Sequence, residues 1–261
     1  MRIPNDINIP TIAICITSFN SENYISRAIN SALDQSVHIN EVIIIDDNSN
    51  DNSYELIRNI TKNNKKIKIF KNRTNKGVAY CRNKLIELTK SEYIIFFDDD
   101  DYSYPERTYY QISRIINYKK KYGENLKVLC YSSRKQIYED SYKKILRPLG
   151  INENTLCPNG IKLAEIILFG SINKEFNGSC PTNSLMAKTE DLRFIKSFDE
   201  KFRRLEDTDL NIRAALNGFH FIEQTEGYYI NLKYFLRIVQ HFLFKFHFFL
   251  IVLKSACHPC W

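Results

Sequence analysis

The chain has 261 residues, of which 44% are hydrophobic and 26% are charged, and its 37 Lys and Arg against 30 Asp and Glu give a net charge of +7. This composition excludes a disordered chain, a collagen-like repeat and a small disulfide-stapled domain. The length fits one large domain or two small ones, at roughly 150 residues per domain. The positive charges are scattered through Lys- and Asn-rich loops such as Lys62–Lys71, so we expect no nucleic-acid partner.

Short apolar runs alternate with segments of helical spacing in the first half of the chain. The runs are residues 12–16, 42–45, 67–70 and 93–97, and the apolar helical faces lie within 24–33, 56–60 and 78–88. Near-continuous apolar strands separated by amphipathic helices are typical of a parallel sheet covered on both faces. We therefore predict an α/β fold with a Rossmann-like, doubly wound, mostly parallel sheet from residue 10 to about residue 130.

The next helix should begin near Tyr104, because Ser103 and Glu106 have capping-box spacing and Pro105 fits a first helical turn. Beyond it the alternation weakens. The remaining expected elements are strands at 128–133, 185–188 and 219–223 and helices at 161–169 and 206–217, the last ended by Gly218. We divide the chain into an α/β half at 1–133, a less regular half of the same domain at 134–230, and a C-terminal tail at 231–261.

The C-terminal tail is unusually apolar. Residues 234–253 are almost all apolar or aromatic, but a few polar side chains interrupt them: Arg237, Gln240, His241, Lys245 and His247. A membrane-spanning helix needs about 20 apolar residues with few charges. We therefore favour an interfacial or partner-binding helix, or a buried packing segment, over a span, and the tail is compatible with peripheral membrane association.

The cysteines give little evidence of a special role. There are seven, an odd number, and Cys15, Cys81 and Cys130 sit in apolar stretches where a thiol serves as a small hydrophobe. Cys257 and Cys260 form one CxxC near the C-terminus, which is weak evidence for zinc without a second pair. The polar segment after Met1 lacks an apolar signal core, so we expect a cytoplasmic protein.

Carboxylates follow two of the predicted strands directly. Asp46 and Asp47 come after the strand at 42–45, and the run Asp98–Asp101 comes after the strand at 93–97. In a doubly wound sheet, ligands bind beyond the carboxyl ends of the strands. Four successive carboxylates repel one another, and a hard divalent cation such as Mg²⁺ or Mn²⁺, completed by substrate phosphates, would remove that penalty. The alternative is a solvated run of Asp at a helix entry.

Five segments, in order, carry a family resemblance. They are TSFN (17–20), EVIIIDDNSNDNS (41–53), NKGVAYCRN (75–83), EYIIFFDDDDYSYPER (92–107) and LEDTDLNIRAALNG (205–218). Together they resemble the inverting nucleotide-sugar glycosyltransferases of family 2, which have the GT-A fold. The resemblance covers about residues 10–230. It implies that residues 134–230 bind the acceptor.

The resemblance also implies residue roles on the donor side. Thr17 and Phe19 would line the base pocket, and Asp47 would accept a hydrogen bond from a base such as uracil. The other residues that it implies to be donor-binding are Lys76, Arg82, Asp98 and Asp99. Among the aspartates of the DXD element, Asp100 would be the main ligand of Mn²⁺ or Mg²⁺. Asp98 would lie nearer the ribose or sugar and also reach the metal, and Asp101 would support them. Ordinary loop packing for Thr17 and Phe19, and a solvated position on an exposed helix face for Arg82, are the alternatives.

On the acceptor side, the resemblance makes Asp207 the general base of an ED motif with Glu206. A carboxylate within hydrogen-bond reach can take the proton of a sugar hydroxyl as the new bond forms. The alternative is that both acids only stabilise the positive end of a helix. Asp209 and Arg213 lie four residues apart on that helix and predict a structural ion pair.

The predicted function is metal-dependent transfer of a sugar from a nucleotide diphosphate sugar, UDP-linked by resemblance, to a hydroxyl of a saccharide or lipid-linked saccharide. The setting would be bacterial surface polysaccharide synthesis at the inner face of the membrane. The family usually has a loop with a His or basic residue after the positions of Glu226–Tyr228, whereas this chain turns apolar. This departure leaves two alternatives open: transfer to a polyprenyl phosphate, and a non-catalytic protein that binds nucleotide sugars.

Overall fold

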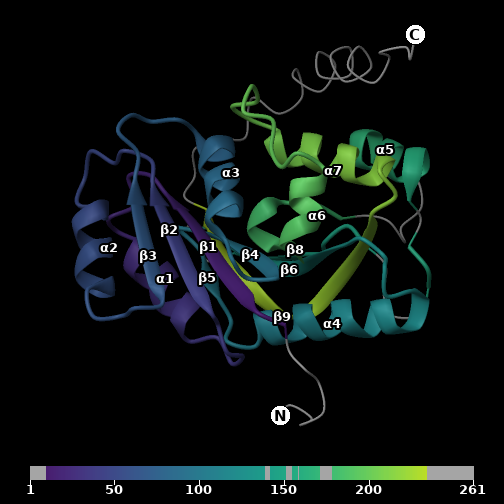
Figure 1. Ribbon diagram of the computed structural model, residues 1–261, viewed down its shortest axis with the longest axis horizontal. Helices are drawn as coiled ribbons and strands as arrows, with labels where there is room; N and C mark the ends of the chain where they lie inside the picture. The colour runs from purple at the N-terminus through teal and green to yellow at the C-terminus, as the bar shows by residue number, and fades with distance from the viewer. Residues whose placement is uncertain (1–9, 139–141, 151–154, 158, 171–177, 234–261) are drawn as a thin grey trace.

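A single mixed sheet organises the protein (Figure 1). The computed structural model describes residues 10–138, 142–150, 155–157, 159–170 and 178–233. The strand order is β3-β2-β1-β4-β8-β6-β9-β5, with β7 paired to β6. The strands are β1 (Ile12–Ser18), β2 (Glu41–Asp46), β3 (Ile67–Lys71), β4 (Tyr93–Asp98), β5 (Tyr102–Ser103), β6 (Val128–Tyr138), β7 (Lys143–Leu146), β8 (Leu185–Lys188) and β9 (His220–Lys233).

Helices cover both faces of this sheet. They are α1 (Ile25–Leu33), α2 (Ser53–Thr61), α3 (Val78–Leu88), α4 (Arg107–Tyr122), α5 (Gly160–Phe169), α6 (Thr189–Phe194) and α7 (Glu206–Leu216), with a 3₁₀ turn η2 (Thr182–Ser184). In Figure 1, α3, α6 and α7 lie over one face, and α1 and α4 lie under the other. This arrangement confirms the predicted doubly wound α/β fold.

The first four strands are parallel and set the edge at which ligands would bind. Residues of β1 and β2 are almost all buried, because helices cover both sides of these strands. The register pairs Ser18 of β1 with Asp46 of β2 and Thr17 of β1 with Asp98 of β4. The carboxyl ends of the three strands are therefore level, and the loops that follow them meet at one edge.

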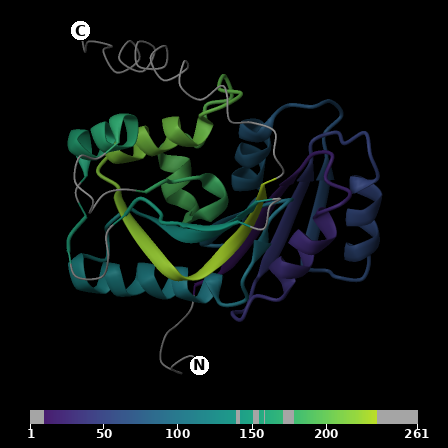
Figure 2. The same cartoon turned by 180° about the vertical axis from the view of Figure 1, so that it is seen from behind.

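The second half of the chain extends the same sheet. β8 pairs antiparallel with both β4 and β6, and β9 pairs parallel with β6 across an irregularity between Ser132 and Arg134. Figure 2, which views the molecule from the other side, shows β9 as a long, bent strand. The division predicted between residues 133 and 134 falls inside β6, so both halves share one continuous sheet.

The predicted start of the helix near Tyr104 is wrong. Helix α4 begins at Arg107, with Glu106 as its N-cap residue and no side-chain capping bond. Ser103 is instead in β5, where it pairs with Tyr229, and its backbone N–H donates to Ser31 Oγ at 3.2 Å. Ser103 thus pairs with a strand instead of capping the helix. This pairing depends on a residue far along the chain, so the local capping pattern could not predict it.

Most remaining expectations about elements are confirmed, including α5, β8 and the end of α7 at Gly218, whose φ is +76°. Cys15, Cys81 and Cys130 are fully buried free thiols, and burial raises the pKa of each to about 12. Among the described residues, no helix has both the length and the apolar character to cross a membrane. The predictions for residues 234–261, including the CxxC pair, lie outside the described residues.

Candidate active site

A cleft of about 500 Å³ opens at the carboxyl end of β1, β2 and β4. It is lined by segments that are distant in sequence: Thr17, Ser18, Phe19, Asp47, Asn75, Gly77, Val78, Cys81, Arg82, Asp98, Asp99, Asp100, Arg203 and Glu206. Phe19 keeps 46% of its surface exposed although it is a large apolar residue. The resemblance pointed to Thr17, Phe19, Asp47, Arg82, Asp98 and Asp99 as donor-binding residues, and all of them line this cleft.

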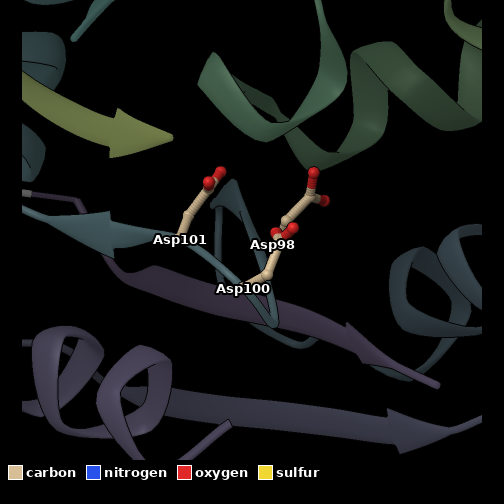
Figure 3. A group of neighbouring side chains, drawn as sticks. All are labelled: Asp98, Asp100 and Asp101. Carbon is tan, nitrogen blue, oxygen red and sulfur yellow. The ribbon is translucent and has the colours of Figure 1, made fainter. Parts of the chain in front are cut away.

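Three of the four successive aspartates form a compact cluster. Asp98, Asp100 and Asp101 each offer a carboxylate oxygen within 4.8 Å of the others, and Figure 3 shows all three side chains directed to the same side of the turn after β4. Burial, and then the charge of Asp98, raise the pKa of Asp100 to about 6. Asp101 is buried and accepts a hydrogen bond from Asn183 Nδ2 at 2.7 Å, which fixes its orientation.

The cluster fits a hard divalent cation. Hard carboxylate oxygens are the donors that Mg²⁺ and Mn²⁺ prefer. The raised pKa of Asp100 reflects a charge that the protein places in partial burial beside another carboxylate. A cation between these oxygens would remove that cost.

Asp99 points elsewhere and holds the β1 loop. Its Oδ2 accepts the backbone N–H of Phe19 at 2.9 Å. Burial raises the pKa of Asp99 to about 7, with smaller contributions from Asp98 and Asp100. Asp99 therefore links the turn after β4 to the loop that presents Phe19 to the cleft.

Asp47 organises the loop that leads into α3. Its Oδ1 accepts from Asn72 Nδ2 at 2.7 Å and from the backbone N–H of Lys76 at 2.8 Å, and its Oδ2 accepts from the N–H of Gly77 at 2.8 Å. The thiol of Cys81 also hydrogen-bonds to this carboxylate, so donors within the protein hold Asp47 in place at the edge of the cleft. Lys76 itself is exposed and contributes a backbone N–H to this loop; its side chain is not among those that line the cleft.

Asp46 differs from its neighbour, although sequence placed both on one rim. Its side chain is fully buried, and its Oδ2 accepts the backbone N–H of Ser49 at 3.1 Å. Successive residues of a strand face opposite sides of the sheet, so of Asp46, the last residue of β2, and Asp47, which follows it, only Asp47 lines the cleft.

Arg82 is buried rather than solvated, which overturns the alternative of an exposed helix face. It is 7% exposed, its Nη1 lies 2.7 Å from Glu206 Oε1, and its Nη2 lies 3.6 Å from Asp98 Oδ1. Burial raises the pKa of Glu206, and the charge of Arg82 opposes that rise. Arg82 thus joins α3, the aspartate cluster and the first turn of α7.

Asp207 faces a different side of α7 from Glu206. Its Oδ1 accepts the backbone N–H of Thr208 at 2.7 Å, and its charge contributes to raised pKa values of Cys180 and Tyr131 after the larger effect of burial. Glu206 lines the cleft and Asp207 does not, so the predicted base stands beside the cleft, toward the loop of Cys180. The predicted Asp209–Arg213 ion pair is confirmed at 2.6 Å.

Comparisons with known proteins agree with this geometry. Residues 13–146, half of the chain, match the family model described as "Glycosyl transferase family 2". The amylovoran biosynthesis glycosyltransferase AmsB of Erwinia amylovora is 29% identical over 216 residues, which are 81% of this chain and 66% of that protein. An "Uncharacterized glycosyltransferase" of Haemophilus influenzae is 42% identical over 96 residues, which are 37% of this chain and 38% of that protein. The alignments thus span less than two thirds of either relative.

A solved structure supports the same architecture. S. aureus TarS in complex with UDP-GlcNAc superposes with a TM-score of 0.65 at 20% identity, and the alignment covers 87% of this chain and 60% of that one. At 20% identity, this superposition shows a common fold and nothing further. The expectation of a GT-A fold is thereby confirmed.

Proposed function

This chain belongs to glycosyl transferase family 2, and from that premise we propose that it moves a sugar from a nucleotide diphosphate sugar to a hydroxyl of a saccharide or lipid-linked saccharide, with inversion. The observation that carries the proposal is the convergence of the aspartate cluster, the Arg82–Glu206 pair and Asp207 around one edge of the sheet. These parts come from the end of β4 and the turn after it, from α3 and from the first turn of α7.

The donor nucleoside would lie against the loops after β1 and β2. The exposed ring of Phe19 offers an apolar face for a base, and the carboxylate of Asp47, which also lines the cleft, would accept a base N–H. Uracil meets this requirement, and TarS, which shares the fold, was solved with UDP-GlcNAc. We propose a UDP-linked donor.

The diphosphate would lie at the aspartate cluster. Asp98 and Asp100, with Asp101 in support, would hold Mn²⁺ or Mg²⁺. When bound, such an ion neutralises the charge that develops on the leaving diphosphate. Arg82 and Asp99 would keep the carboxylates and the β1 loop in place through the contacts described above.

Asp207 would act as the general base. The acceptor oxygen forms a bond to the anomeric carbon while the bond from that carbon to the diphosphate oxygen breaks, and its electron pair leaves with the nucleotide. The acceptor proton passes to the carboxylate of Asp207. The position of Asp207 beside the cleft leaves the cleft free for the donor and lets the acceptor enter from the side of Cys180.

The names of relatives suggest the setting. AmsB is named for amylovoran biosynthesis. We propose that this chain likewise contributes to a bacterial polysaccharide.

The test is a transfer assay with UDP-sugars, Mn²⁺ and a panel of saccharide and lipid-linked acceptors, read by nucleotide release and product mass. Wild type should turn over a donor and acceptor pair. Asp207→Asn should bind the donor with nearly unchanged affinity and lose turnover by about 100-fold or more, whereas Asp199→Asn, the same change at an aspartate that does not line the cleft, should keep most activity. Donor binding without turnover for any acceptor would instead indicate a non-catalytic binding protein.

A further inference from the structure

Arg203 is a cleft residue that sequence motifs did not single out. It lies two residues before Leu205, the N-cap residue of α7 with a φ of +66°, and it lines the cleft beside Gly77. Its guanidinium is packed so close to Gly77 that Nη1 would be 2.7 Å from a Cβ at that position. The loop before α7 thus places a cation over the beginning of α3.

The acidic side chains that line the cleft form no ion pair with Arg203. Five acids line it, namely Asp47, Asp98, Asp99, Asp100 and Glu206, together with two arginines. Arg82 is already paired with Glu206 and Asp98. Within the described part of the chain, the guanidinium of Arg203 makes no hydrogen bond or ion pair. It is therefore available for an anion from outside the protein.

The local field also favours an anion beside Arg203. Gly77 is the N-cap residue of α3, a helix of 11 residues. The N-terminus of a helix carries partial positive charge and favours anions, and the carboxylate of Asp47, which accepts the N–H of Gly77 at 2.8 Å, supplies one negative charge there. The planar guanidinium matches phosphate oxygens in a two-pronged geometry, and backbone N–H groups at a helix start bind the same oxygens.

We propose that Arg203 binds the diphosphate of the nucleotide sugar, in the cleft that Asp98 and Asp100 also line. This inference rests on the proposed function, because the anion is the donor's own diphosphate. Arg203 would then hold the leaving group between itself and the start of α3. It would join the loop before α7 to the donor.

Calorimetry with uridine, UMP and UDP in Mn²⁺ buffer tests the proposal. Arg203→Gln should weaken UDP binding roughly 10-fold or more, as expected for the loss of a charged hydrogen bond, and leave uridine binding unchanged. Arg203→Lys should recover part of the loss, and Arg204→Gln, the same change one residue along, should bind UDP like wild type. Thermal unfolding of each variant shows whether it folds.

The outcomes separate the two proposals. If wild type binds UDP and Arg203→Gln binds it equally well, Arg203 only packs against Gly77 and this inference is wrong while the proposed function stands. An equal loss of affinity for uridine and UDP would show a general disturbance of the cleft, and would also overturn it. If wild type binds neither UDP nor a UDP-sugar, the proposed function itself fails.

Discussion

Replacing Arg82 by Met should strongly destabilise the protein through Glu206. The two side chains are 8% and 11% exposed and meet at 2.7 Å. At that separation two unit charges attract by about 6 kcal/mol at an effective dielectric constant of 20. Much of this offsets the cost of desolvating both groups, and breaking a buried pair from one side typically costs about 3–5 kcal/mol. We expect Arg82→Met to lose roughly 3 kcal/mol of unfolding free energy at pH 7.5.

A double-mutant cycle in urea isolates the pair. In Glu206→Gln alone, Arg82 keeps Asp98 as a partner at 3.6 Å. The double variant, Arg82→Met with Glu206→Gln, should recover at least half of the unfolding free energy that Arg82→Met loses, because it leaves no buried charge unpaired. Burial already raises the pKa of Glu206, and Arg82 opposes this, so the single variant should take up a proton at higher pH than wild type. Its deficit should therefore shrink as the pH falls toward 5.5. Additive effects with no pH dependence would refute this reasoning.

Three further predictions concern other described residues. Asp100→Asn should stabilise the metal-free protein in EDTA at pH 7.5 by on the order of 2 kcal/mol. The pKa of Asp100 is raised to about 6, so the wild-type protein loses unfolding free energy as the pH rises through that value, and the variant does not. Equal stability of the two proteins in urea would count against this prediction. Burial lowers the pKa of His220 from 6.5, so the stability of wild type relative to His220→Gln should fall as the pH falls below 6.5, and a constant difference would contradict this. Gly77→Ala should cost about 1–3 kcal/mol in thermal or urea unfolding, because Gly77 has a φ of +92°; an unchanged midpoint would show that the loop tolerates the strain.

The sequence predicted those features that depend on neighbours along the chain. The Asp209–Arg213 pair follows from helical spacing, and the end of α7 follows from Gly218 at a left-handed position. Three of the parallel strands, β1, β2 and β4, were visible because their apolar runs are buried on both faces; the run of β3 is only partly buried. In each case the energy that decides the structure is local or comes from burial of a whole segment.

Features set by distant contacts were beyond the sequence. Arg82 is buried because Glu206, 124 residues away, packs against it. Which of Glu206 and Asp207 faces the cleft depends on how α7 is rotated, since successive helical residues differ by about 100°, and the left-handed Leu205 sets that rotation. The insertion of β9 between β6 and β5 likewise depends on the whole sheet.

The proposed function depends on the aspartates after β4 gathering a divalent ion and a nucleotide diphosphate in the cleft. A calorimetric titration of a UDP-sugar into wild type and Asp100→Ala, each with Mn²⁺ and with EDTA, measures this. Mn²⁺ should strengthen binding to wild type at least 10-fold, roughly the value of one charged interaction, and Asp100→Ala should lose this enhancement. Equal affinity in all four titrations would show that the aspartates gather no ion for the donor.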